Sequence, residues 1–138
     1  MARHVTVPED ARSKQLRHYH NKRKRDAKYR ANRKTDLSRW LRTALKSKRY
    51  HAKKQGIPFD LDVEWLQLQP MQCAITGKMF VIPDHGAGPL TPSFDQINPS
   101  QGYTKNNTRL VCLWYNYAKG AFPDSDIRAL IREAAQVV

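Results

Sequence analysis

The 138-residue sequence has no uninterrupted apolar segment of the ~18 residues that a membrane-spanning helix needs. Its first residues, MARHVTVPED, also lack the apolar centre of a secretory signal peptide. Cysteine is scarce, and the two residues, Cys73 and Cys112, lie far apart in the chain, so a disulfide framework is not indicated. These absences argue against a membrane protein and favour a cytoplasmic protein with reduced thiols.

Acidic residues are also scarce: 12 Asp and Glu stand against 25 Lys and Arg, which gives a formal net charge of +13. Residues 1–56 hold 19 of the basic and 4 of the acidic residues, whereas residues 57–138 hold 6 and 8. A basic excess of this size attracts polyanions, of which nucleic acid is the commonest. We therefore expect a basic arm at 1–56 that binds nucleic acid and a nearly neutral body at 57–138. A basic arm that serves only solubility is the alternative.

The arm contains two helical patterns. Residues 9–36 have no Pro or Gly and are rich in helix formers, but they have no apolar face. We therefore expect this segment to be disordered or frayed alone, and to become ordered on nucleic acid or by docking on the body. Residues 35–56 predict an amphipathic helix with Thr35 or Asp36 as its N-cap and Gly56 at its end. Its outer face carries basic residues suited to phosphates: Arg39, Arg42, Lys46, Arg49, Lys53 and Lys54. An ordinary helix with a solvated face is the alternative.

The body predicts an α+β fold with few strands. Residues 62–69 predict a short helix that Pro70 stops, and CAITGKMF predicts a strand with a turn at Thr76 and Gly77. SFDQI and TRLVCLW predict two strands that the turn-rich NPSQGYTKNN joins.

Two helices are expected after the second strand. YNYAKGAF begins a helix that ends at Gly120, and the last helix follows with Asp124 or Ser125 as its N-cap. Its apolar residues recur at helical spacing and are expected to be buried, namely Ile127, Leu130, Ile131 and Ala134.

A strand, a loop, a second strand and a helix form a compact ββα unit that can present Asp95 and Asn116 toward one point. A carboxylate and an amide oxygen are hard ligands, suited to Mg²⁺ or Mn²⁺ with several bound waters and a phosphate. Spacing alone leaves a structural alternative open, in which Asp95 caps a turn and the asparagines satisfy loop backbone.

Several linked segments resemble one nuclease family. CAITGKMF, PSFDQINPSQGYTKNNTRLVC and NYAKGAF, in this order, are similar to the HNH (His-Me finger) endonucleases, particularly their bacteriophage-encoded branch. The basic helix and the segment after it also resemble the region found upstream in that family, so the likeness covers Leu37 to Val138. It implies a ββα-metal finger with flanking helices behind a basic N-terminal helical arm, and a host-cell cytoplasmic location if the chain is phage-encoded.

The resemblance also implies roles for individual residues. Asp95 matches the metal-binding Asp of the Asp-His pair, and Asn116 matches the last residue of the triad, also a metal ligand. Asn107 matches the middle Asn that ties down the loop. Gly102 lies at the tight turn of that loop. Lys119 takes the Asn-x-x-Lys position, where its cation would meet a phosphate.

Two positions depart from the family pattern. Thr76 and Tyr115 replace the second cysteines of two Cys-x-x-Cys pairs, so we expect no structural zinc. Gln96 replaces the general-base His, and a carboxamide has no useful basicity. Three interpretations remain open: His85 acts as the base, solvent or substrate phosphate accepts the proton, or the site binds without cutting.

The sequence thus predicts a metal-dependent HNH-type DNA endonuclease that uses Mg²⁺ or Mn²⁺ and binds the backbone of duplex or branched DNA. A catalytically weak or inactive DNA-binding protein on the same fold is the main alternative, and an RNA-binding protein of ribosomal type explains the arm but not the finger. Two units pairing as a homodimer would cut both strands. The cut sequence and the choice between DNA and RNA are not encoded in a recognisable pattern.

Overall fold

The computed structural model describes the backbone of residues 9–35 and 37–138, and the side chains of residues 10–28 and 37–138. Its elements are α1 (Glu9–Thr35), α2 (Leu37–Gln55), α3 (Val63–Leu68), β1 (Pro92–Gln96), β2 (Thr108–Cys112), α4 (Leu113–Lys119) and α5 (Asp124–Val137). The fold is α+β, as predicted. Within the described ranges, no helix combines the length and apolar character needed to cross a membrane.

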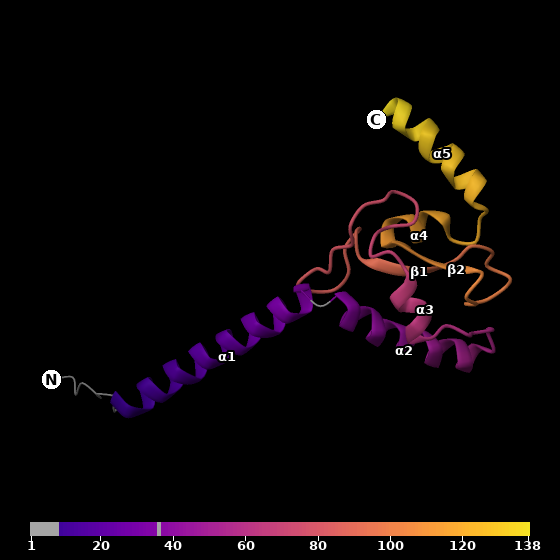
Figure 1. Ribbon diagram of the computed structural model, residues 1–138. Helices are drawn as coiled ribbons and strands as arrows, with labels where there is room; N and C mark the ends of the chain where they lie inside the picture. The colour runs from indigo at the N-terminus through magenta and orange to yellow at the C-terminus, as the bar shows by residue number, and fades with distance from the viewer. Residues whose placement is uncertain (1–8, 36) are drawn as a thin grey trace.

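Helix α1 is long and straight, and it extends away from the body (Figure 1). At a rise of about 1.5 Å per residue it is roughly 40 Å long. Every side chain described on it, from residues 10–28, is exposed, including Leu16 and Tyr19, so this part of the helix buries no apolar face against another element. The helical pattern is confirmed, but the expectation that the segment is ordered only on nucleic acid or against the body is not met, because α1 is a continuous helix that projects from the body (Figure 1).

Helix α2 buries one stripe and exposes another. Leu41, Leu45 and Ala52 are buried, because apolar residues three, four and seven apart share one helical face. Gly56 follows with φ of +67°, and Ile57 N donates to Ala52 O at 2.9 Å, so the predicted glycine ending is confirmed. The predicted caps, Thr35 and Asp36, lie outside the described side chains.

The segment after α2 is fastened to the loop between the strands. Tyr103 N donates to Pro58 O at 2.9 Å, and Asp60 N donates to Tyr103 O at 3.2 Å. The Lys105 backbone N–H donates to Asp60 Oδ1 at 2.7 Å, and its ammonium lies 2.6 Å from Asp62 Oδ2. Asp62 also caps α3 by accepting from Trp65 N, so the predicted short helix is confirmed.

The two strands form an antiparallel sheet in which Asp95 pairs with Arg109 and Phe94 with Leu110. Side chains alternate between the two faces of a strand. Phe94 and Leu110 therefore share one face and join the core, where Trp65 of α3 stacks against Phe94 at 6.3 Å between ring centroids. Asp95 and Arg109 lie on the opposite face.

Two predicted details are wrong. CAITGKMF forms a turn at Gly77 with one isolated bridge between Gln72 and Met79, not a strand, because the turn returns after a single pairing. Helix α5 begins after Pro123 without a side-chain cap, so neither Asp124 nor Ser125 serves as N-cap.

The predicted inner face of α5 is only partly buried. Ile127 is buried and Ile131 is half-buried, but Leu130 and Ala134 are exposed. Helix α5 contacts the body through its first turns and then extends outward (Figure 1), which leaves its later apolar residues uncovered.

Candidate functional site

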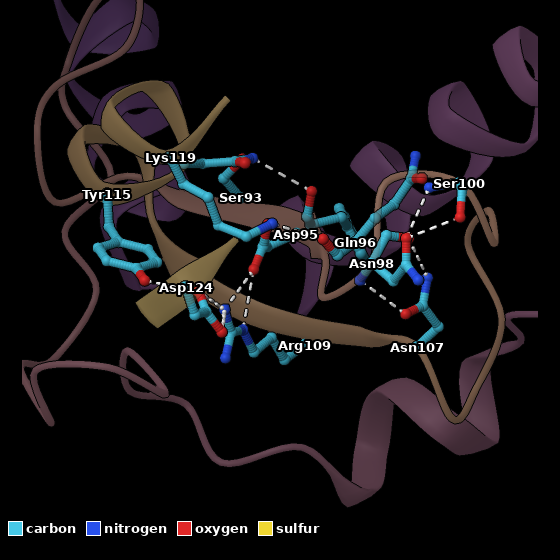
Figure 2. A network of polar contacts seen from close by, with 12 residues as sticks. Ser93, Asp95, Gln96, Asn98, Ser100, Asn107, Arg109, Tyr115, Lys119 and Asp124 are labelled. Carbon is cyan, nitrogen blue, oxygen red and sulfur yellow. Dashed lines mark hydrogen bonds and ion pairs between the residues drawn. The ribbon is translucent and has the colours of Figure 1, made fainter. Parts of the chain in front are cut away.

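Asp95 is the centre of the site and is almost completely buried, with 1% of its surface exposed. Lys119 Nζ lies 3.0 Å from Asp95 Oδ1, and Arg109 Nε donates to Oδ2 at 2.8 Å. Figure 2 shows the carboxylate held between these two cations. Arg109 reaches it because the strand register places the two residues directly opposite each other.

A second carboxylate completes the network from α5. Arg109 Nη2 lies 2.7 Å from both oxygens of Asp124, and Tyr115 Oη donates to Asp124 Oδ1 at 2.6 Å (Figure 2). Burial opposes ionisation of Asp124, but the bonds from Arg109 and Tyr115 outweigh it and lower the pKa of Asp124. Burial and the bond to Asp124 raise the pKa of Tyr115. Two carboxylates and two cations therefore balance one another.

Lys119 does not occupy the position expected of a phosphate-binding cation. Its exposed fraction is 0%, and its ammonium donates to Gln96 O at 2.6 Å as well as to Asp95. Lys119 and the buried Tyr115 are four residues apart, so both lie on the inner face of α4. The sequence-based placement of Lys119 at the nucleic-acid surface is wrong in this structure.

Asn116 lies on α4 and reaches β1. Its Nδ2 donates to Ser93 Oγ at 2.6 Å and to Phe94 O at 3.2 Å. The structure thus brings Asn116 to the two residues that precede Asp95. These bonds use the amide nitrogen, and no hydrogen bond within the described side chains uses Asn116 Oδ1. The amide oxygen is the atom that a hard metal ion would take.

The side chains of Gln96, which stands at the general-base position, and of His85, the candidate base, lie outside the hydrogen bonds around Asp95. Gln96 follows Asp95 on the strand, so its side chain leaves from the other face, and its Oε1 is buried without a hydrogen-bond partner. His85 is exposed in the Pro- and Gly-rich loop before β1. In the described part of the chain, no hydrogen bond joins His85 to Asp95. The structure does not bring His85 into the network around Asp95.

Asn107 ties down the loop between the strands, as predicted. Its Oδ1 accepts from Asn98 N at 2.9 Å, and its Nδ2 donates to Asn98 O at 2.9 Å and to Gly102 O at 2.8 Å. Asn98 in turn accepts from Ser100 (Figure 2). Gly102 has φ of +77°, and a Cβ there would lie 2.6 Å from Pro58 O, so both the backbone and the space require glycine.

The predicted basic residues of α2 lie on its outer side. All six predicted residues are exposed, and five of them recur three and four positions apart along one side of the helix; we call these five the basic stripe: Arg39, Arg42, Lys46, Arg49 and Lys53. Arg49 has an internal role as well, because its Nη2 donates to Leu61 O at 3.0 Å. Lys54 lies beside the stripe, 5.3 Å from the ring centre of Tyr50.

Cys73 and Cys112 lie far apart in the sequence but close together in the core. Cys112 N donates to Cys73 Sγ at 3.2 Å, and both cysteines are buried and free. Burial opposes ionisation of Cys73, but donors from Thr76, Cys112 and Ile75 outweigh it and lower the pKa of Cys73 to about 7. Burial and the neighbouring Cys73 raise the pKa of Cys112 to about 11.

Sequence reasoning missed Arg109, Asp124 and the inward position of Lys119. The pairing of Arg109 with Asp95 could have been predicted, because the register of the two strands places these residues opposite each other. Among the described side chains, those of residues 10–28 and 37–138, no three from His, Cys, Asp or Glu gather closely enough to hold a metal ion. Comparison of the chain with family models, curated proteins and solved structures returns no match.

Proposed function

We propose that this chain is an endonuclease of HNH type, in which β1, β2 and α4 form the finger and the basic arm holds the DNA backbone. One observation supports the proposal most: α4 lies against β1, so that Asn116 meets the backbone beside Asp95. The HNH pattern implies a metal-binding carboxylate on the first strand and a second metal ligand on the helix, and here these would be Asp95 and Asn116. Asn107 and Gly102 support it further, because they fix the loop that joins the strands.

Asp95 and Asn116 supply the oxygen donors that suit Mg²⁺ or Mn²⁺. The anchored Nδ2 of Asn116 fixes the amide, and no hydrogen bond occupies its oxygen in the described region. These donor types fit a hard divalent ion. When bound, such an ion supplies charge neutralisation at the phosphate and its leaving oxygen.

The other residues orient the Asp95 carboxylate and hold the phosphate backbone. Arg109 and Lys119 fix the Asp95 carboxylate, and the basic stripe with α1 positions the phosphate backbone. Helix α1 matches about one turn of duplex in length, since a turn of B-DNA is ~34 Å long. With Gln96 in place of a base, proton transfer falls to solvent, to the substrate phosphate or to His85, and the rate falls by ~10²–10⁴-fold.

Plasmid nicking with Mg²⁺ or Mn²⁺ tests the proposal. We expect the wild type to nick slowly and Asn116→Ala to lose activity, while Asn106→Ala, an exposed loop control, keeps it. Gln96→His should raise the rate by ~10²-fold or more. If His85→Ala abolishes cutting, His85 is the base. Equal nicking by Asn116→Ala and the wild type would show that the activity is a contaminant.

A non-catalytic nucleic-acid-binding protein is the second candidate. One observation favours it: cations engage both carboxylate oxygens of Asp95. This candidate predicts tight, salt-sensitive DNA binding without metal-dependent cleavage. Both candidates require the basic stripe, so Arg42→Gln should weaken binding and reduce the slope of log affinity against log salt by about 1. Lys78→Gln, an exposed lysine of the body, is the control.

A further inference from the structure

Lys119 is unusual because a lysine is rarely buried completely. Its ammonium has no solvent to stabilise it, and it is held by one carboxylate oxygen of Asp95 and by the backbone carbonyl of Gln96. A carboxylate oxygen and a carbonyl oxygen are also what a hard metal cation takes as ligands. The ammonium of Lys119 therefore already supplies a positive charge at Asp95, the residue that the proposed function makes a metal ligand.

The charges around Lys119 are already balanced. Asp95 and Asp124 carry two negative charges, and Lys119 and Arg109 carry two positive charges. A divalent ion at Asp95 would add positive charge beside a buried ammonium, in surroundings where water screens poorly. The ion and the ammonium cannot both be well accommodated on the same carboxylate oxygen.

We propose that Lys119 is the resident cation of the finger, and that it competes with a divalent metal ion for Asp95. The inference rests on the proposed function, because that function makes Asp95 a metal ligand. It adds that metal binding requires the ammonium of Lys119 to leave Asp95 Oδ1. It also follows that the finger is held together without a metal, since the ammonium joins α4 to β1.

Removal of the ammonium should open the site. Lys119→Met keeps an unbranched apolar stem but has no charge, so Asp95 retains only Arg109 as a cationic partner. We expect this variant to bind Mn²⁺ about tenfold or more tightly than the wild type, the size of a typical coupling between two ligands. Lys119→Gln should behave alike, and because its amide can still donate to Gln96 O, it serves if Lys119→Met does not fold.

The test is a titration of the full chain with Mn²⁺, followed by calorimetry and by the loss of the free-Mn²⁺ paramagnetic signal, with no nucleic acid present. Lys78→Met is the matched control, because Lys78 is exposed. We expect tight binding by the two Lys119 variants, weak binding by wild type and Lys78→Met, and none when Asp95→Asn is added to Lys119→Met.

Two results would overturn the inference, and they differ in meaning. Equal affinity of wild type and the Lys119 variants, lost on Asp95→Asn, would show a metal site that Lys119 does not obstruct, and the proposed function would stand. Failure of every protein to bind Mn²⁺ would remove both the inference and the metal dependence of the proposed function.

Discussion

Replacement of Asn107 by Asp tests the loop anchor with a change of one atom. The side-chain amide donates to two backbone carbonyls, Asn98 O at 2.9 Å and Gly102 O at 2.8 Å. A carboxylate has the same shape but no donor, so both bonds are lost and an oxygen faces two carbonyl oxygens. Asn107 is only 6% exposed, so water cannot replace the missing donor.

The loss can be estimated from these bonds. Each lost bond is worth roughly 1 kcal/mol net, and carbonyls left unsatisfied in a buried site add about 1–3 kcal/mol. We expect Asn107→Asp to reduce the free energy of unfolding by about 3–5 kcal/mol. A domain of ordinary stability has about 5–15 kcal/mol, so the variant would remain folded but visibly weakened.

Urea denaturation followed by circular dichroism measures this change as a lower midpoint. Asn106→Asp is the control, because Asn106 is adjacent and exposed and carries the same charge change. It should shift the midpoint little. The deficit of Asn107→Asp should also shrink in acid, where the new carboxyl is protonated and can donate once. Equal losses at positions 106 and 107 would refute the anchor.

Two further predictions concern a glycine and a thiol. Gly102→Ala should lose about 2–5 kcal/mol of stability in the same urea assay, because the alanine would have an unfavourable positive φ and its Cβ would clash with Pro58 O. Gly56→Ala is the control, because Gly56 also has a positive φ but a Cβ there would meet no other atom, and it should lose only about 1–2 kcal/mol. The pKa of Cys73 is lowered from 9.0 to about 7, so its thiolate stabilises the fold above pH 9.0 and this contribution is lost as the pH falls through 7. The pKa of Cys112, raised to about 11, acts oppositely between 9 and 11. Stability should therefore rise by up to about 2 kcal/mol from pH 7 to 9; a profile unchanged by Cys73→Ala would contradict the assignment.

Local patterns predicted the elements well, because they depend on neighbours in sequence. The 3.6-residue spacing of Leu41 and Leu45 gave the buried side of α2, and the alternation around Asp95 gave β1. The loop-anchoring role of Asn107 and the tight turn at Gly102 were also predicted, from the turn-rich loop and from the resemblance to HNH endonucleases. Helix ends were less accurate, and Leu113, predicted in the strand, begins α4.

Long-range charge pairing was not predictable in the same way. Asp124 was expected to cap α5, but it pairs with Arg109, a choice that depends on how α5 packs on the sheet. Lys119 lies inside because α4 turns that side toward β1, and a single lysine gives no periodic signal of its orientation. Leu130 is exposed because α5 extends beyond the body after its first turns. An amphipathic pattern alone does not show how far along a helix the packing continues.

The contacts of α2 with the finger have a mechanical consequence. Lys48 Nζ donates to Tyr103 Oη at 3.3 Å, and Arg49 donates to Leu61 O at 3.0 Å, so two successive basic residues fasten the helix to the loop and to the segment beside it. Figure 1 shows α2 lying along the body over its length. These bonds hold α2 at a fixed position relative to the loop between the strands. Under the proposed function, a phosphate backbone bound to the basic stripe would lie at a constant distance from Asp95, and that distance would determine which phosphodiester bond comes nearest to it.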